Sequence, residues 1–161
     1  MVVEALEDHW AQVRDGDPRV LSLFARHYSA RHSAGVWRGY RNGRGHDGGR
    51  IVGPGERLVL LTPDGRGLFV WRRARYRLDQ QTGVNCAVFR NEGPTLSSAL
   101  ILEAEGWAWQ KWPGERLFTF VDSTKVRSTN PGFCFLKAGW VRVGHTPKGL
   151  LIMEKLHHDR R

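Results

Sequence analysis

The spacing of apolar residues changes several times along the chain, and each spacing predicts an element. Residues 2–13 carry apolar side chains at helical spacing, which predicts a first amphipathic helix. Asp17 followed by Pro18 is typical of a helix start, and Phe24 and Tyr28 then fall on one helical stripe. The pattern therefore predicts two helices near the N-terminus, the second reaching Tyr28.

Most of the remaining chain has the apolar, β-branched and aromatic character of strands. The runs at 57–62 and 67–73 flank a Pro-Asp-Gly turn, which predicts a β-hairpin. Further strands are expected at 84–90, 115–122, 140–146 and 149–156, with helices at 97–109 and 131–139. This order predicts a single α+β domain over 1–161, with a mostly antiparallel sheet flanked by helices and a crossover helix in its middle.

Composition narrows the class of protein. The chain has 161 residues and is 40% hydrophobic, which suits one folded domain. No apolar stretch approaches the roughly 20 residues that cross a bilayer, and the acidic N-terminus is unlike a signal peptide. Cys86 and Cys134 have no zinc-site spacing and are expected to be reduced core residues. We therefore expect a cytoplasmic protein with no membrane partner.

The positive charge is concentrated in one segment. The net charge is +9, and residues 29–50 form a basic, Gly-rich loop with interleaved aromatic residues, as a surface that binds nucleic acid requires. The candidate phosphate contacts are Arg31, Arg38, Arg41 and Arg44, joined by Lys125 and Arg127 in a later polar turn. DNA or another nucleic acid is the expected partner. The alternatives are a generally basic proteome, and aromatic residues that only anchor the loop on the core.

The element order of residues 55–156 ends in a short helix with Lys137-Ala138-Gly139-Trp140 and a further strand. This order resembles the GNAT fold of acyltransferases. In that family, backbone N–H groups of the turn after the fourth strand, with the following helix N-terminus, hold the pyrophosphate of acetyl-CoA. The resemblance implies that acyl-CoA, or another acyl donor, is bound by Arg90, Gly93, Thr95 and Ser98.

The chain departs from the usual GNAT pattern at four positions, one of which is Thr95 in place of the usual small residue. Pro94 lacks an amide hydrogen, and Glu92 adds a negative charge beside the expected phosphate site. Phe135 occupies the place where many GNAT enzymes carry a tyrosine that protonates the leaving thiolate, and a phenyl ring cannot donate a proton. These departures favour either a relative with different chemistry or a protein that shares only the shape.

A more specific resemblance is to the Mom-type proteins of bacteriophages, GNAT-related enzymes that modify adenine in phage DNA. The matching pieces occur in the same order: a His27-Tyr28 pair after a helix, a helix start at Ser97, and a strand that ends at Asp122. The resemblance implies that His27, Tyr28, Ser97 and Asp122 are catalytic. A bound iron has been proposed in such proteins, and a metal here would use His27 and Asp122.

Each of these residues also has a structural interpretation. His27 and Tyr28 are equally consistent with packing at a helix end, and Asp122 with a turn beside Ser123 and Thr124. Ser97 and Ser98 would serve as helix caps with or without any chemistry.

Three functions follow from these observations. The first is a GNAT-like transferase that places an acyl or aminoacyl-type group on an exocyclic amine of a nucleic-acid base. The second is a conventional acyl-CoA-dependent N-acetyltransferase of a small amine or a protein. The third is a non-catalytic, GNAT-shaped protein that binds nucleic acid.

Overall fold

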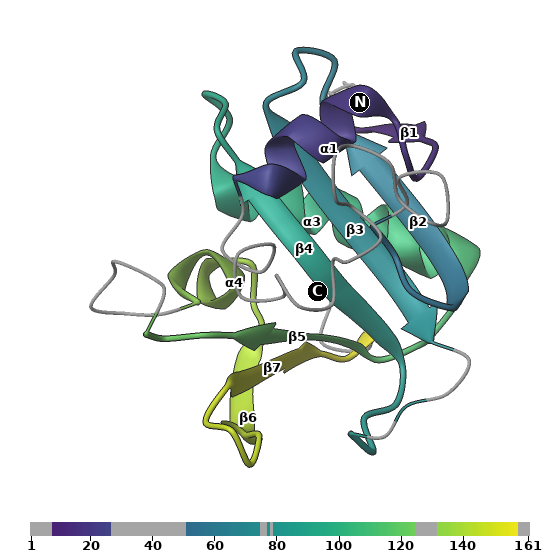
Figure 1. The fold of residues 1–161 in the computed structure, drawn as a ribbon. Helices are drawn as coiled ribbons and strands as arrows, with labels where there is room; N and C mark the ends of the chain where they lie inside the picture. The colour runs from purple at the N-terminus through teal and green to yellow at the C-terminus, as the bar shows by residue number, and fades with distance from the viewer. Residues whose placement is uncertain (1–7, 27–50, 75–76, 78, 125–131, 158–161) are drawn as a thin grey trace, which may run out of the picture.

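A computed structural model of the chain describes residues 8–26, 51–74, 77, 79–124 and 132–157. Within them lies one open sheet with the strand order β1-β2-β3-β4-β5-β7-β6 (Figure 1). The strands are β1 (Ala11–Val13), β2 (Gly55–Leu61), β3 (Gly67–Ala74), β4 (Val84–Asn91), β5 (Leu117–Val121), β6 (Val141–His145) and β7 (Leu151–Lys155). Every neighbouring pair is antiparallel except β4 and β5. The predicted α+β class and mostly antiparallel sheet are confirmed.

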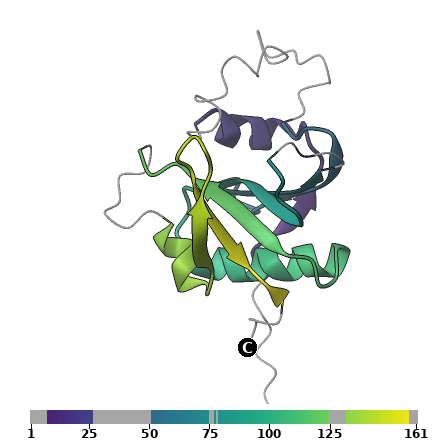
Figure 2. The same ribbon diagram turned by 90° about the horizontal axis from the view of Figure 1, so that it is seen from below.

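The helices of the described residues cover both faces of the sheet. They are α1 (Pro18–Ala25), α3 (Ser97–Lys111) and α4 (Phe133–Lys137). Figure 2 shows α1 on one face and α3 on the other. Asp17 caps α1 through its side chain, and Pro18 occupies the first turn, as the sequence predicts. Of the predicted stripe, Phe24 is buried, and Tyr28 lies outside the described residues.

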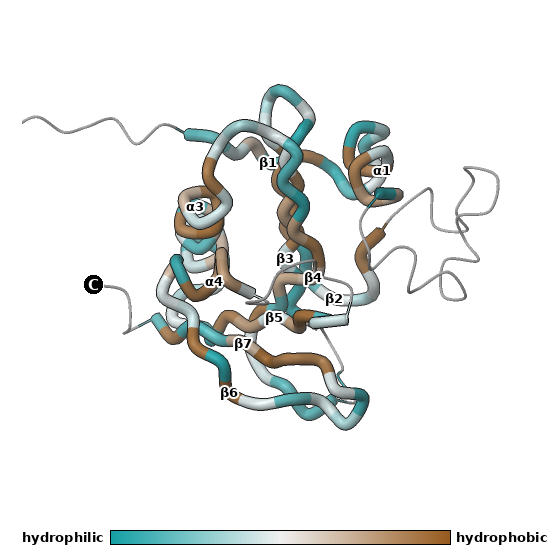
Figure 3. The backbone as a smooth tube through the Cα atoms, turned by 90° about the vertical axis from the view of Figure 1, so that its left-hand side faces the viewer, coloured by the Kyte–Doolittle hydropathy of each residue, from teal (hydrophilic) through white to brown (hydrophobic). Residues whose placement is uncertain are grey.

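Two apolar clusters lie against the sheet, one on each face. Val20, Leu23 and Phe24 of α1 pack on apolar side chains of β2, β3 and β4. The larger cluster lies between the opposite face and α3, and includes Trp71 and Trp140, both almost fully buried. The apolar stretches of the central strands therefore lie between the two helices, as the hydropathy colouring in Figure 3 shows.

The sheet opens in its middle, between β4 and β5. These parallel strands are joined by the crossover helix α3, and their register covers only Val84–Cys86 against Leu117–Thr119. Beyond that point the two strands diverge (Figure 1). The Thr119 hydroxyl donates to the Cys86 carbonyl at 3.0 Å at the last paired position. The predicted crossover helix is confirmed.

The predicted first helix is wrong in its described part, because residues 11–13 form strand β1 on the edge of β2. Trp10 packs into the cluster beneath α3 and donates its Nε1–H to the Leu100 carbonyl at 2.9 Å. Val13 packs into the cluster beneath α1 instead. A helix would place Trp10 and Val13 on one face, whereas both clusters need an apolar residue, so an extended chain that alternates between faces is favoured.

The state of the two cysteines and the character of the helices were both predicted from composition. Cys86 and Cys134 are both free thiols, the first buried and the second partly buried, as expected of core residues. Burial raises the pKa of the Cys86 thiol, so it is protonated at neutral pH. No helix in the described part of the chain combines the length and the apolar character needed to span a membrane.

Candidate functional site

The turn that follows β4 is organised by the side chain of Asn91. Its Nδ2 donates to the Thr95 carbonyl at 2.7 Å and to the Ser97 hydroxyl at 2.9 Å, while its Oδ1 accepts from the Gly93 amide at 3.0 Å. One side chain thus fixes both ends of the turn and joins it to the first residue of α3. The sequence suggested Arg90 and Gly93 as the important residues here, and Asn91 was missed. Asn directly after a strand and before a Gly-Pro turn is the signal for it.

The backbone amides of this turn are largely used within the protein. The Glu92 amide donates to the Arg66 carbonyl at 2.8 Å, and the Gly93 amide donates to Asn91. Pro94 has no amide hydrogen. The turn therefore differs from a phosphate-binding loop whose N–H groups point outward, and the donors that remain for an anion lie at the start of α3.

Helix α3 begins without a side-chain cap. Its N-cap residue is Leu96, and no side chain bonds to the amides of the first turn. The prediction that Ser97 and Ser98 cap the helix is wrong. Ser97 is itself the first helical residue, and its hydroxyl is the acceptor for Asn91. The first turn of this 15-residue helix thus has no side chain to satisfy its amides, beside the exposed side chain of Leu96.

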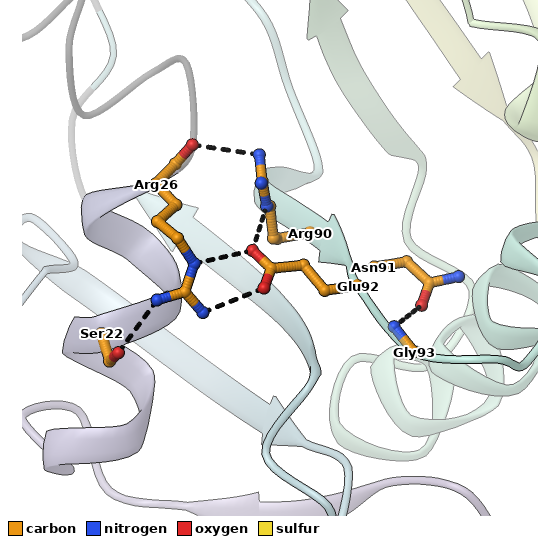
Figure 4. A network of polar contacts seen from close by, with 6 residues as sticks. All are labelled: Ser22, Arg26, Arg90, Asn91, Glu92 and Gly93. Carbon is orange, nitrogen blue, oxygen red and sulfur yellow. Dashed lines mark hydrogen bonds and ion pairs between the residues drawn. The ribbon is translucent and has the colours of Figure 1, made fainter.

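Charged side chains join this turn to the end of α1, as Figure 4 shows. The Glu92 carboxylate accepts from Arg26 at 2.9 and 3.0 Å and from Arg90 at 2.8 Å. Arg90 also donates through Nη1 to the Arg26 carbonyl at 3.0 Å. The hydrogen bonds to Arg26, with a further contribution from Arg90, lower the pKa of Glu92 to about 2. The guanidinium of Arg90, predicted to bind the acyl donor, is thus committed to holding α1 against the turn.

This network predicts a specific pH dependence. Because the pKa of Glu92 is lower in the folded protein than the usual 4.5, the carboxylate stabilises the fold above that value. The stabilisation is lost as the pH falls towards about 2. Glu92→Gln should be less stable than the parent protein by up to about 1 kcal/mol at pH 7, since the pair is partly exposed.

Urea unfolding at pH 7, 4, 3 and 2 measures this effect. The stability difference between the parent protein and Glu92→Gln should shrink below pH 4.5 and vanish near pH 2. Arg90→Gln serves as a comparison, because it weakens the same network without removing a carboxylate. A difference that stays constant across this range would contradict the assignment.

Asp122 follows the last residue of β5, on the side where β4 and β5 separate. Its Oδ1 accepts from the Thr124 amide at 3.0 Å and from the Thr124 hydroxyl at 2.6 Å. This bonding matches the turn interpretation of Asp122. The catalytic role that the Mom-type resemblance implies for Asp122 stays a prediction.

Phe135 is a core residue of α4 whose ring packs against β4. It is 6% exposed. Its ring lies edge-on to Phe89 of β4 at 6.1 Å and to Trp140 at 4.9 Å between ring centroids. Trp140 in turn stacks on Trp71 of β3. The phenyl ring at the position of the usual GNAT tyrosine therefore connects α4 to the central strands by aromatic packing.

A cavity of about 380 Å³ lies on the other side of the turn after β4. It is lined by the tip of the β2–β3 hairpin, by His9, and by Gly93, Pro94 and Thr95. The His9 amide donates to Glu103 at 2.7 Å, which holds the N-terminal segment on α3. Gly93 and Thr95, both predicted to bind the donor, thus border a recess between the hairpin and α3.

Several predicted site residues lie outside the described parts of the chain: His27, Tyr28, Arg31, Arg38, Arg41, Arg44, Lys125, Arg127 and the basic loop 29–50. The described candidates fall into two groups. Arg90, Gly93, Thr95, Ser97 and Ser98 share the turn after β4 and the start of α3, and Asp122 stands at the end of β5. Asp122 is the only described member of the candidate metal site. Nowhere in the described residues do three or more His, Cys, Asp or Glu side chains form a group suited to a metal ion.

We compared the chain with protein-family models, with curated proteins and with solved structures, and none of the three comparisons found a match.

Proposed function

We propose that this chain is a GNAT-like transferase that modifies a base in DNA, in the manner of the phage Mom-type proteins. The group transferred would be of acyl or aminoacyl type, and the acceptor an exocyclic amine of the base. Support comes from the parallel pair β4 and β5, joined by α3 and separated beyond Cys86 and Thr119. The GNAT resemblance expects a splayed centre of this kind at the active site.

One observation carries the proposal: the hydrogen bond from Arg90 to the carbonyl of Arg26. Arg26 directly precedes His27 and Tyr28, the candidate catalytic pair. The bond holds the chain just before this pair against the turn after β4, where the donor is expected. The proposed site therefore draws on three segments that are distant in sequence: the end of α1, the start of α3 and the end of β5.

The chemistry needs a base, a donor site and a surface for DNA. Asp122 or His27 would accept the amine proton while the new C–N bond forms and the bond between the acyl carbon and its leaving group breaks. The uncapped start of α3 offers N–H groups and the positive end of the helix dipole to an anionic donor or a developing oxyanion. The basic loop 29–50 would follow the phosphates, with the base flipped out of the duplex.

The second candidate is a GNAT-shaped protein that binds nucleic acid without catalysis. The internal hydrogen bonds of the Glu92 and Gly93 amides favour it, as does the packing of Phe135, because neither feature offers a group to an acyl donor. A conventional acyl-CoA N-acetyltransferase is the remaining alternative. This function requires acetyl-CoA to bind at the turn, where the internal bonds of the Glu92 and Gly93 amides leave fewer N–H groups for its pyrophosphate.

Mass spectrometry of nucleosides separates these functions. DNA from cells that express the chain should contain a nucleoside of increased mass that is absent from cells with the empty vector. A normal nucleoside profile in the presence of a competent donor would contradict the enzyme. DNA binding that weakens steeply with salt would then favour the non-catalytic protein. Micromolar binding of acetyl-CoA without DNA binding at moderate salt would favour the conventional acetyltransferase.

A further inference from the structure

A row of side chains crosses the sheet on the face that carries α1, beyond the apolar cluster that α1 covers. Register pairs link Arg57 to Arg72, Arg72 to Asn85, and Asn85 to Phe118. Side chains of directly paired residues lie on the same face of a sheet. Arg72 is two residues beyond Val70, which packs beneath α1, so the whole row lies on that face.

Ion pairs flank this row, whereas Arg72 at its centre forms none among the described residues, and the Asp79 carboxylate, which is bonded to Arg77, acts on it only at longer range. Arg57 forms an ion pair with the buried carboxylate of Asp15 at 3.0 Å. At the other end, Arg116 pairs with Glu154 at 2.9 Å. Arg72 has no carboxylate partner among the described residues and donates only to the Pro54 carbonyl, at 3.1 and 2.9 Å. Arg72 lies directly opposite Arg57, whose charge Asp15 already balances.

Arg72 is held in a fixed position. A Cβ atom placed on Gly53 would lie 2.9 Å from its Cζ, so the chain at Gly53 is close against the guanidinium group. Burial, and then repulsion from Arg77 and Arg57, lowers the pKa of Arg72. Nε and Nη2 bond to Pro54, which leaves the N–H groups of Nη1 for a ligand.

Beside Arg72, two buried polar atoms have no hydrogen-bond partner within the described residues. They are Oδ1 of Asn85, in a residue only 8% exposed, and Nη1 of Arg77. The Arg77 guanidinium lies over the Phe118 ring at 4.9 Å and is paired with Asp79 through its other nitrogens. A buried polar group left unpaired costs roughly 1–3 kcal/mol, so these atoms indicate a partner beyond the described residues, such as a bound ligand.

We propose that Arg72, Arg77 and Asn85 bind a hydroxyl-bearing oxyanion, of which hydrogen phosphate is the simplest. The free N–H groups of the two arginines would donate to the anionic oxygens. The phosphate hydroxyl would donate to Oδ1 of Asn85, the one acceptor in the set. Of the three proposed ligands, Arg77 also borders a cavity of about 680 Å³, whose other lining residues include Glu56, Gln80 and Thr82.

This site is separate from the proposed donor site. Asn85 lies near the start of β4, whereas the donor turn follows the end of that strand at Asn91. The inference therefore does not rest on the proposed function, and either can fail alone.

Thermal unfolding tests the inference, with chloride exchanged for phosphate or sulfate at constant ionic strength and pH 7. At about five times its Kd, phosphate should raise Tm by about 2–4 °C. Sulfate has the same shape but no hydroxyl at this pH, so Oδ1 of Asn85 would stay unpaired. Its Kd should be at least about tenfold higher than that of phosphate.

Variants separate specific binding from the general stabilising effect of both salts. Arg72→Gln should lose the specific part of the phosphate shift. Arg66→Gln removes the same charge from an exposed position in the β2–β3 turn, and this variant should keep the specific part of the phosphate shift. Asn85→Leu should raise Tm without phosphate, because an unpaired buried amide is removed, and should lose the preference for phosphate over sulfate.

Two results would overturn the inference: equal shifts with phosphate and sulfate, or an unchanged phosphate shift in Arg72→Gln. A nucleoside monophosphate and a short DNA duplex identify the source of the anion. Displacement of bound phosphate by the monophosphate assigns the site to small phosphorylated ligands. Displacement by the duplex as well assigns it to a nucleic-acid end or backbone.

Discussion

Replacing Lys155 with Met should lower the free energy of unfolding by about 3–5 kcal/mol. Lys155 and Glu105 are 4% and 0% exposed, and their charged atoms lie 2.7 Å apart. Lys155 also donates to the Ala138 carbonyl at 2.6 Å, and Trp140 donates to Glu105 at 3.2 Å. The pair joins α3, the turn after α4, and β7. Without Lys155, the carboxylate of Glu105 would be buried without its compensating charge.

The double variant Glu105→Leu/Lys155→Met tests whether the cost comes from an unpaired charge. With both charges removed, the loss should be smaller than for either single substitution, although Trp140 and the Ala138 carbonyl each lose a partner. Arg73→Gln is the exposed comparison, since it breaks the pair with Glu115 and should cost at most about 1 kcal/mol. Urea unfolding followed by tryptophan fluorescence measures all five proteins: the parent, Lys155→Met, Glu105→Leu, the double variant and Arg73→Gln. Additive losses in the double variant would contradict the coupling.

Asp122→Asn should reduce base modification by about 10²–10⁴-fold, if Asp122 is the general base of the proposed reaction. Asparagine keeps an Oδ1 that can accept from the Thr124 amide and hydroxyl, so the turn after β5 is preserved. It cannot take up the amine proton at neutral pH. Stability should therefore change by less than about 0.5 kcal/mol while the activity is lost.

The matched control for this position is Thr124→Val. It removes the hydroxyl that bonds to Asp122 at 2.6 Å but leaves the carboxylate in place. The modified nucleoside should remain easily detectable in this variant. Undiminished modification by Asp122→Asn would assign the proton transfer to another residue. A loss of activity together with a loss of stability would indicate that Asp122 serves the turn alone.

The elements with a strong local signal were predictable from the sequence. The β2–β3 hairpin has two β-rich runs around a Pro-Asp-Gly turn, and α1 has Asp17 and Pro18 at its start. The apolar face of α3 identified the crossover helix, because a helix that packs on a sheet needs one continuous apolar stripe. The residues on either side of a turn or a cap are adjacent in sequence, so no knowledge of the tertiary structure was needed.

The sequence also indicated Arg90 and Gly93 as residues of the candidate site, but it did not indicate which hydrogen-bond partners their polar atoms have. The guanidinium of Arg90 is committed to Glu92 and to the Arg26 carbonyl, and the latter bond joins positions 64 residues apart. Contacts of this kind depend on which elements the fold brings together, and no local pattern records them. For the same reason, the spacing of residues 2–13 suggested a helix, although Trp10 and Val13 serve opposite faces of the sheet.

By itself, the sequence determined the class of the fold, the order of nearly all its elements, and the strand β5 that Asp122 follows. Only the tertiary structure decided which partners the individual polar groups have. It buries Glu105 against Lys155, commits Arg90 to α1, and leaves Asn85 beside Arg72 and Arg77 with an acceptor that no described residue pairs. The physical reason is that periodicity records which side of an element faces the core, whereas pairing across strands and helices depends on register and packing.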